Sequence, residues 1–131
     1  MQIGAVGEHL AAAAIVRAGY SCDIVNGQGY DIIVFDNKDV YRVEVKSASE
    51  AKRVTVQDKC RFYSYCVARG SRVKRLISDD DADIVALVAN DIKAVTFMPV
   101  KDVKTMRVRL KTNDFGDETK SFREAIKGMQ R

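Results

Sequence analysis

Two β-forming segments, residues 30–36 (YDIIVFD) and 40–47 (VYRVEVKS), flank the polar stretch Asn37-Lys38-Asp39. Both segments are rich in β-branched and aromatic residues, and a short connection containing Asn and Asp is typical of a tight turn. The pattern predicts an antiparallel hairpin, and the rest of the fold has to be built around it.

The register of this hairpin decides which of its charged side chains meet. Side chains alternate between the two faces of a strand, so Glu44 and Lys46 share a face. A two-residue turn places Asp31 opposite Glu44, and a four-residue turn places it opposite Lys46 on that same face. A three-residue turn would separate the two carboxylates. The even turns also align the apolar residues of both strands, so we expect Asp31, Glu44 and Lys46 to converge.

Two carboxylates beside a lysine suit the hydrolysis of a phosphodiester bond. Mg²⁺ prefers oxygen ligands, keeps several waters and binds through one or two carboxylates plus substrate phosphate. The ion polarises the phosphodiester and lowers the pKa of a bound water. A lysine can orient that water or stabilise charge on the phosphate. The alternative reading is an exposed ion pair on a sheet, which is what Glu-x-Lys on a strand usually forms.

The remaining segments predict one α/β domain of 131 residues, with a core at about 4–100 and a C-terminal extension at about 101–131. The expected elements are a helix at 5–17, strands at 20–25, 30–36 and 40–47, a helix within 52–69, a second hairpin at 83–89 and 94–98, and a C-terminal amphipathic helix containing Phe122, Ala125, Ile126 and Met129. The order α-β-β-β-α-β-β-(α) predicts a mixed sheet flanked by helices. Thr55, with Asp58 three residues later, is the expected cap of the middle helix.

Several function classes are disfavoured. The three cysteines have no CxxC spacing and His9 is the only histidine, so a zinc site, a disulfide framework or a histidine triad is not expected. Asp79 to Asp81 lacks the spacing of an EF-hand and is interpreted as a solvent-exposed loop. The glycine loop at 26–29 lacks the third glycine of a dinucleotide-binding motif. Without a signal peptide or an apolar segment of membrane-spanning length, we expect a cytoplasmic protein with no membrane partner.

Positive side chains cluster after the predicted hairpin, in a chain whose formal net charge is +4. The first set is Lys52, Arg53, Lys59, Arg61, Arg69, Arg72, Lys74 and Arg75, and the second is Lys101, Lys104, Arg107, Arg109 and Lys111. Such clusters bind phosphates without regard to sequence. They predict a DNA partner, branched or duplex, and the alternative is a solvated surface.

Gly29-Tyr30-Asp31 and Glu44-Val45-Lys46, in a helix–strand–hairpin–helix context, resemble the PD-(D/E)XK nuclease superfamily over roughly residues 4–100. The helix carrying Gly7-Glu8 looks most like that of archaeal-type Holliday junction resolvases. The second hairpin, with Phe97-Met98-Pro99, is also similar to homing and restriction-type endonucleases. The resemblance implies a restriction-endonuclease-like core.

The resemblance also implies roles for individual residues. Asp31 and Glu44 would bind the metal, with the carbonyl of Val45 as a third ligand, and Lys46 would be the catalytic lysine. Glu8 would match a carboxylate that many members place near the metals from the first helix.

Two further positions, Gln57 and Tyr30, bear on the resemblance. Gln57 would match a polar residue at the start of the following helix and join Lys52, Arg53, Lys59, Arg61, Arg72, Lys74 and Arg75 in binding DNA. Tyr30 stands where the motif's name has proline, a position that varies widely in the superfamily.

The implied function is an Mg²⁺-dependent DNA endonuclease, with Mn²⁺ able to substitute. Our first expectation is a structure-specific enzyme acting on four-way junctions. The alternatives are a site-specific homing or restriction-type endonuclease and a non-catalytic DNA-binding or assembly module. Cutting two strands with one site per chain implies a homodimer or larger assembly, with Phe122, Ile126 and Met129, or Val108 and Leu110, as the expected interface.

Overall fold

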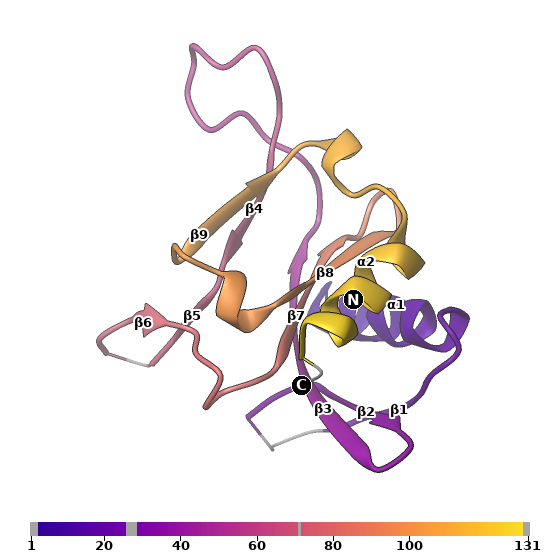
Figure 1. Ribbon diagram of the computed structural model, residues 1–131. Coiled ribbons are helices and arrows are strands. Elements are labelled where there is room, and N and C mark those ends of the chain that lie inside the picture. The colour runs from indigo at the N-terminus through magenta and orange to yellow at the C-terminus, as the bar shows by residue number, and fades with distance from the viewer. Residues whose placement is uncertain (1–2, 26–28, 71, 130–131) are drawn as a thin grey trace.

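A five-stranded mixed sheet forms the centre of the computed structural model, which describes residues 3–25, 29–70 and 72–129 (Figure 1). The strands are, in spatial order, β1 (Ser21–Ile24), β2 (Ile32–Asp36), β3 (Asp39–Ala48), β7 (Ile84–Ala89) and β8 (Ala94–Pro99). β3 and β7 run parallel, and every other neighbouring pair in this sheet is antiparallel. The predicted α/β fold with a mixed sheet is therefore confirmed.

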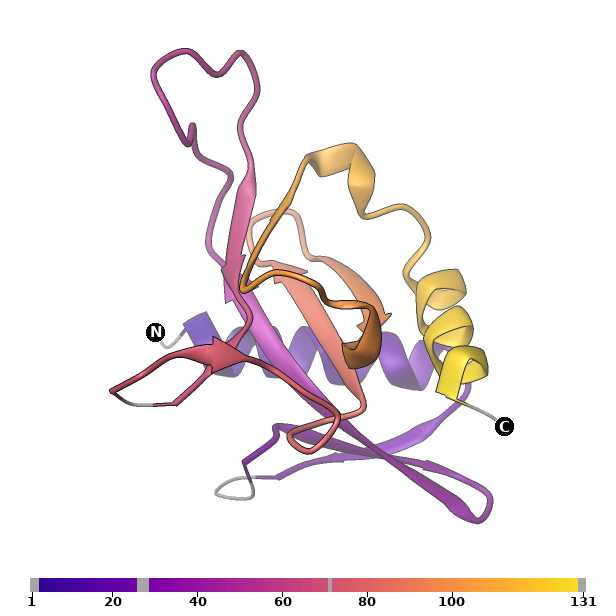
Figure 2. The same ribbon diagram turned by 60° about the vertical axis from the view of Figure 1, so that its left-hand side comes forward.

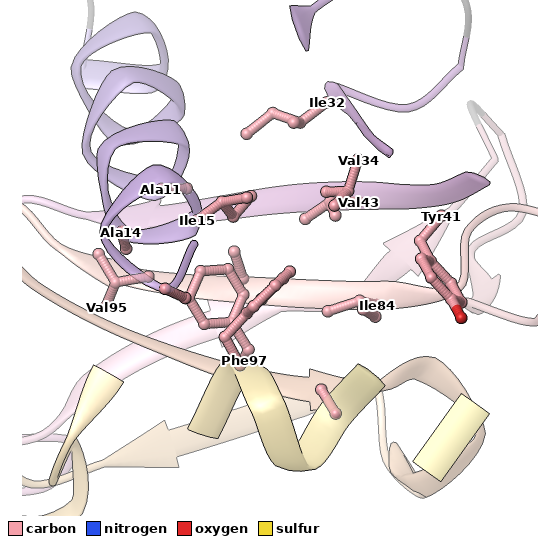
Figure 3. Packing of buried hydrophobic residues seen from close by; sticks show 14 of the residues in the cluster. Ala11, Ala14, Ile15, Ile32, Val34, Tyr41, Val43, Ile84, Val95 and Phe97 are labelled. Carbon is pink, nitrogen blue, oxygen red and sulfur yellow. The ribbon is translucent and has the colours of Figure 1, made fainter. Parts of the chain in front are cut away.

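Both α-helices pack on one face of this sheet. α1 (Ile3–Arg17) and α2 (Glu118–Met129) contribute small and apolar side chains to a core that contains Ile15, Val43 and Phe97 (Figure 3). The alanines of α1 let the helix lie close to the strands beneath it, and Ala11 and Ala14 are fully buried. Among the described residues, neither helix is long and apolar enough to cross a membrane.

A small sheet covers the opposite face. It consists of β4 (Tyr63–Cys66) and β9 (Arg107–Leu110), which pair antiparallel. The short strands β5 (Ala68–Arg69) and β6 (Arg75–Leu76) form a further hairpin, and 3₁₀ helices lie at Val100–Asp102 and Thr112–Asp114. Side chains of β7 point alternately to the two sides of the central sheet. Ile84 packs on the side of the helices, and Leu87 packs on the side of the small sheet.

The prediction of a helix within residues 52–69 is wrong, because the structure has a loop and strands there. Residues 49–62 form a long loop that projects away from the sheet (Figures 1 and 2), and a strand follows it. Tyr63 and Tyr65 are buried at a spacing of two, whereas Val56, on the expected helical stripe, is 85% exposed. Asp58 accepts hydrogen bonds from the backbone N–H groups of Val54 and Thr55, so it closes a turn and caps no helix.

The C-terminal helix is confirmed, but its apolar side is not an interface. The ring of Phe122 lies between Tyr20 and Phe97, with centroids 5.1 and 4.9 Å away, and Ile126 is 2% exposed. These side chains complete the core of one chain, so the expectation that they join two chains is wrong. Val108 and Leu110 belong to β9, and their half-buried side chains pack against the core between the two sheets.

The first hairpin has the predicted register. Asp36 pairs with Asp39 across the two-residue turn Asn37-Lys38, and Ile32 pairs with Val43. Asn37 has φ 55°, a conformation that Asn tolerates better than most residues. The second hairpin also forms as predicted, with β7 and β8 joined through residues 90–93. Gly29 is the described part of the expected loop at 26–29, and the other three positions lie outside the described residues.

Candidate active site

Asp31 immediately precedes β2 and extends its pairing with β3 by one residue. Its backbone N–H donates to the carbonyl of Val43 at 3.0 Å, and its Oδ2 accepts from the backbone N–H of Val45 at 2.7 Å. The two contacts hold the carboxylate over β3, at the position that the register assigns opposite Glu44. Val45 itself is half-buried and packs against the core, so its backbone is the part of it that meets Asp31. A metal ligand role for its carbonyl stays a prediction.

Glu44 and Lys46 lie on the face of β3 turned away from the helices. Glu44 is only 6% exposed, and its Oε1 lies 3.9 Å from the Lys46 Nζ. Burial raises the pKa of Glu44 to about 7, and the charge of Asp31 and a hydrogen bond with it act in the same direction. The nearby cations Lys46 and Arg69 partly offset this rise. The predicted convergence of Asp31, Glu44 and Lys46 is therefore present.

Glu8 reaches the same place from the first helix. Gly7 lies so close to β3 that a Cβ on it would stand 1.8 Å from the Oγ of Ser47. This close approach carries the next residue toward the hairpin. Burial raises the pKa of Glu8, and the charge of Asp31 and a hydrogen bond with it raise it further. Asp31 is thus the carboxylate between Glu8 and Glu44.

Arg69 is a neighbour of this site that the sequence analysis placed in the first basic cluster but did not assign to the carboxylates. Its Nη1 donates to the Oε2 of Glu44 at 2.9 Å, and its Nε lies 3.8 Å from the Oδ1 of Asp81. The residue belongs to β5, a strand in the region where we expected a helix. No local pattern links residues 44 and 69, because their contact depends on how the chain after β3 returns over the sheet.

The loop at 79–81 is only partly the solvent-exposed segment expected. Asp79 and Asp80 are exposed, but the side chain of Asp81 is 9% exposed and forms a two-point ion pair with Arg75, each contact 2.8 Å long. Hydrogen bonding from Arg75 lowers the pKa of Asp81. Arg75 is therefore committed to a structural ion pair.

The donor set fits one hard divalent cation that keeps part of its water shell. Within residues 3–25, 29–70 and 72–129, no group of three or more Asp, Glu, His or Cys side chains is placed to hold a metal ion, so the direct carboxylate donors are limited to Asp31 and Glu44. Asp31 and Glu44 supply two carboxylates, and the negative charge of Asp31 contributes to the raised pKa of Glu44. A cation bound between them would relieve this repulsion between the carboxylates. Mg²⁺ is usually bound by one or two carboxylates plus water and phosphate.

Apart from Arg75, which pairs with Asp81, the predicted DNA-binding residues fall into two groups. Lys52, Arg53, Gln57, Lys59 and Arg61 are all exposed on the projecting loop. Gln57 therefore lies in a loop and does not begin a helix, which corrects that part of the expectation. Arg72 and Lys74 are exposed between β5 and β6. The structure brings neither group into contact with the carboxylates through a hydrogen bond or ion pair among the described residues.

Comparisons with known proteins bear on the family and the fold of the chain. A family model described as PD-(D/E)XK endonuclease matches residues 1–127. The bacterial homing endonuclease I-Ssp6803I has a similar structure, with a TM-score of 0.70 and 16% identity, over 97% of this chain and 93% of that one. Archaeoglobus fulgidus Hjc, a Holliday junction resolvase from an archaeal hyperthermophile, is similar over 87% and 88%, with a TM-score of 0.49 and 17% identity. No curated protein matches.

Proposed function

Because the chain belongs to the PD-(D/E)XK endonuclease family, we propose that it is a divalent-metal-dependent endonuclease that hydrolyses DNA, with Mg²⁺ as the ion and Mn²⁺ as a substitute. The observation that carries this proposal is the placement of Asp31 beside the buried carboxylate of Glu44, with Lys46 on the same face of β3. A purely structural ion pair would not require a second carboxylate at that position.

The side chains divide the work as follows. Asp31 and Glu44 hold the cation, which when bound polarises the phosphodiester and lowers the pKa of a water. Lys46 lies 3.9 Å from Glu44 and orients the attacking water or stabilises charge on the phosphate. Glu8 supports Asp31 from the side of α1 and is the candidate for an outer ligand that acts through water.

The surface favours duplex DNA as the substrate. Arg107 and Arg109 on β9 pair with Cys66 and Ser64 on β4, and all four side chains are exposed on the outer side of this two-stranded ribbon. A two-stranded ribbon fits the major groove of duplex DNA, and Arg is the side chain that most often reads guanine there. Together with the projecting loop, these elements favour the site-specific alternative over our first expectation of a junction-specific enzyme.

A substrate panel tests the proposal. Linear duplex, single strand, flap, splayed fork and four-way junction are each incubated with Mg²⁺, with Mn²⁺ and with chelator. Asp31→Asn and Lys46→Ala should each lower cleavage by at least about 100-fold while DNA binding persists. Asp39→Asn and Lys38→Ala are matched controls, since both residues are exposed at the hairpin turn.

The outcomes separate the alternatives. Cleavage of selected duplex sequences supports the site-specific reading, and paired nicking of the junction alone would restore the junction-specific one. A wild-type protein that binds DNA but cuts none of these substrates with any divalent metal would identify a non-catalytic module.

We also propose a homodimer, since each chain carries one candidate site and a duplex has two strands to cut. Its interface does not involve the buried side chains of Phe122 and Ile126. Light scattering with size-exclusion chromatography, with and without DNA, measures the mass. A monomer in both conditions would rule the homodimer out.

A further inference from the structure

The guanidinium of Arg69 lies against the candidate metal site. Its Nη1 donates to the Oε2 of Glu44 at 2.9 Å, and 28% of the Arg69 side chain is exposed. A Cβ on Gly29 would lie 3.4 Å from its Nη2, which places the guanidinium near the backbone that leads into Asp31. Arg69 therefore lies between the Glu44 carboxylate and the backbone that leads into Asp31.

Both oxygens of Glu44 already face cations of this chain. Oε2 accepts the hydrogen bond from Arg69 at 2.9 Å, and Oε1 lies 3.9 Å from the Nζ of Lys46. An oxygen that coordinates a divalent cation is poorly placed to keep a guanidinium at hydrogen-bond distance, because the two positive charges repel each other. Metal binding at Glu44 and the Arg69 contact are thus in competition.

We propose that Arg69 is a further residue of the active site, which holds Glu44 until a divalent cation binds and then binds a phosphate of the DNA. This inference rests on the proposed function. It adds that the metal releases a phosphate-binding arginine, so that metal and DNA strengthen each other's binding. The arginine is suited to this task because its planar fork matches a phosphate with two parallel hydrogen bonds.

Asp81 keeps the released arginine near the site. Its carboxylate is fixed by Arg75 and by the backbone N–H of Ser78, at 2.8 and 2.9 Å, and its Oδ1 lies 3.8 Å from the Nε of Arg69. The contact to Asp81 involves Nε, and the contact to Glu44 involves Nη1. The outer nitrogens can therefore leave Glu44 while Nε stays beside Asp81.

Calorimetric titration of the full chain with Mn²⁺ tests the competition without measuring cleavage. Glu44→Gln first establishes that the metal binds at this site. Arg69→Gln is compared with Arg72→Gln, which removes the same charge from the same hairpin at an exposed position. We expect Arg69→Gln to bind Mn²⁺ about tenfold more tightly than Arg72→Gln does, because only the former frees Glu44.

DNA binding supplies the second readout. Ca²⁺ takes the place of Mg²⁺ in this assay, and chelator removes the metal. In chelator, wild type and Arg69→Gln should bind duplex DNA with similar affinity, since Arg69 is engaged by Glu44. In Ca²⁺ the wild type should gain about tenfold over the variant. Arg69→Lys, which keeps the charge without the planar fork, should show a smaller gain and serves as the reference if Arg69→Gln unfolds.

Two results would overturn the inference in distinguishable ways. Glu44-dependent Mn²⁺ binding with equal affinity in Arg69→Gln and Arg72→Gln would exclude the competition and leave the proposed function intact. Mn²⁺ binding that is absent, or that persists unchanged in Glu44→Gln, would contradict both the inference and the metal site on which it rests.

Discussion

Replacing Glu44 with glutamine removes a carboxylate whose pKa is raised from the ordinary 4.5 to about 7 by burial and by Asp31. In the wild type, the folded protein therefore binds the proton of the Glu44 carboxyl group more tightly than the unfolded chain does. The contribution of Glu44 to stability is therefore most favourable below the unfolded pKa, falls as the pH rises from 4.5 to about 7, and stays lower above that range. The glutamine resembles the protonated form at every pH.

The magnitude follows from the two pKa values. Each pKa unit corresponds to about 1.4 kcal/mol, so ionising Glu44 in the folded protein lowers the free energy of unfolding by about 3 kcal/mol at high pH. Glu44→Gln should be more stable than wild type by about that amount near pH 8.5, and the difference should vanish near pH 4. The ion pairs of Glu44 do not reverse the sign of this stability difference. The pKa of about 7 already includes the lowering effect of Lys46 and Arg69.

Urea unfolding in chelator, followed by circular dichroism across this pH range, measures the difference. Glu50→Gln is the matched control, because it removes an exposed carboxylate and relieves no burial. Adding Mg²⁺ should reverse the order at high pH, since a ligand that binds the folded state stabilises wild type and not the variant. Equal stability of Glu44→Gln and wild type at high pH, or an equal gain at low pH, would refute the reasoning.

Two further predictions concern the packing that positions the site. Gly7→Ala places a Cβ 1.8 Å from the Oγ of Ser47 and should cost about 1–3 kcal/mol in thermal or urea unfolding, with partial recovery in the double variant with Ser47→Ala. Gly4→Ala in the same helix meets no atom within 4 Å and should be neutral or stabilising; a similar loss there would point to a general helix effect. Phe122→Ala should cost about 3–5 kcal/mol at every protein concentration, because the ring is buried within one chain; a loss that depends on concentration would instead indicate a subunit interface.

The site could be predicted from sequence because its parts lie in one hairpin. Alternation in β2 and β3 puts Ile32 and Val43 on the core face, and the register that aligns them also brings Asp31 to the face of Glu44. Local periodicity and a short turn contain all of this information. Glu8 was accessible only through the family resemblance, since its approach depends on the contact between Gly7 and Ser47.

The middle of the chain was mispredicted because its pattern has two interpretations. Val56, Cys60, Tyr63 and Val67 follow a helical spacing, yet Tyr63, Tyr65 and Val67 also alternate as a strand does. The strand prevails because β9, far along the chain, supplies its pairing partner and covers the same apolar layer. A local sequence pattern contains no information about a pairing partner so far along the chain. The contact between Arg69 and Glu44 was missed for the same reason.

The central strand β7 has a consequence for how the molecule reaches its fold. Its six residues, Ile-Val-Ala-Leu-Val-Ala, are all buried, and its parallel pairing joins Ile84 to Val43 across the whole projecting loop and the small strands. Such pairing forms late in folding, because the long connection must close first. Until then this uncharged apolar segment, which lacks proline, can pair with the same segment of another chain. Asp83 and Asp91 flank this segment in the sequence, and charges at such positions oppose self-association. We therefore expect that neutralising both lowers the refolding yield as the protein concentration rises.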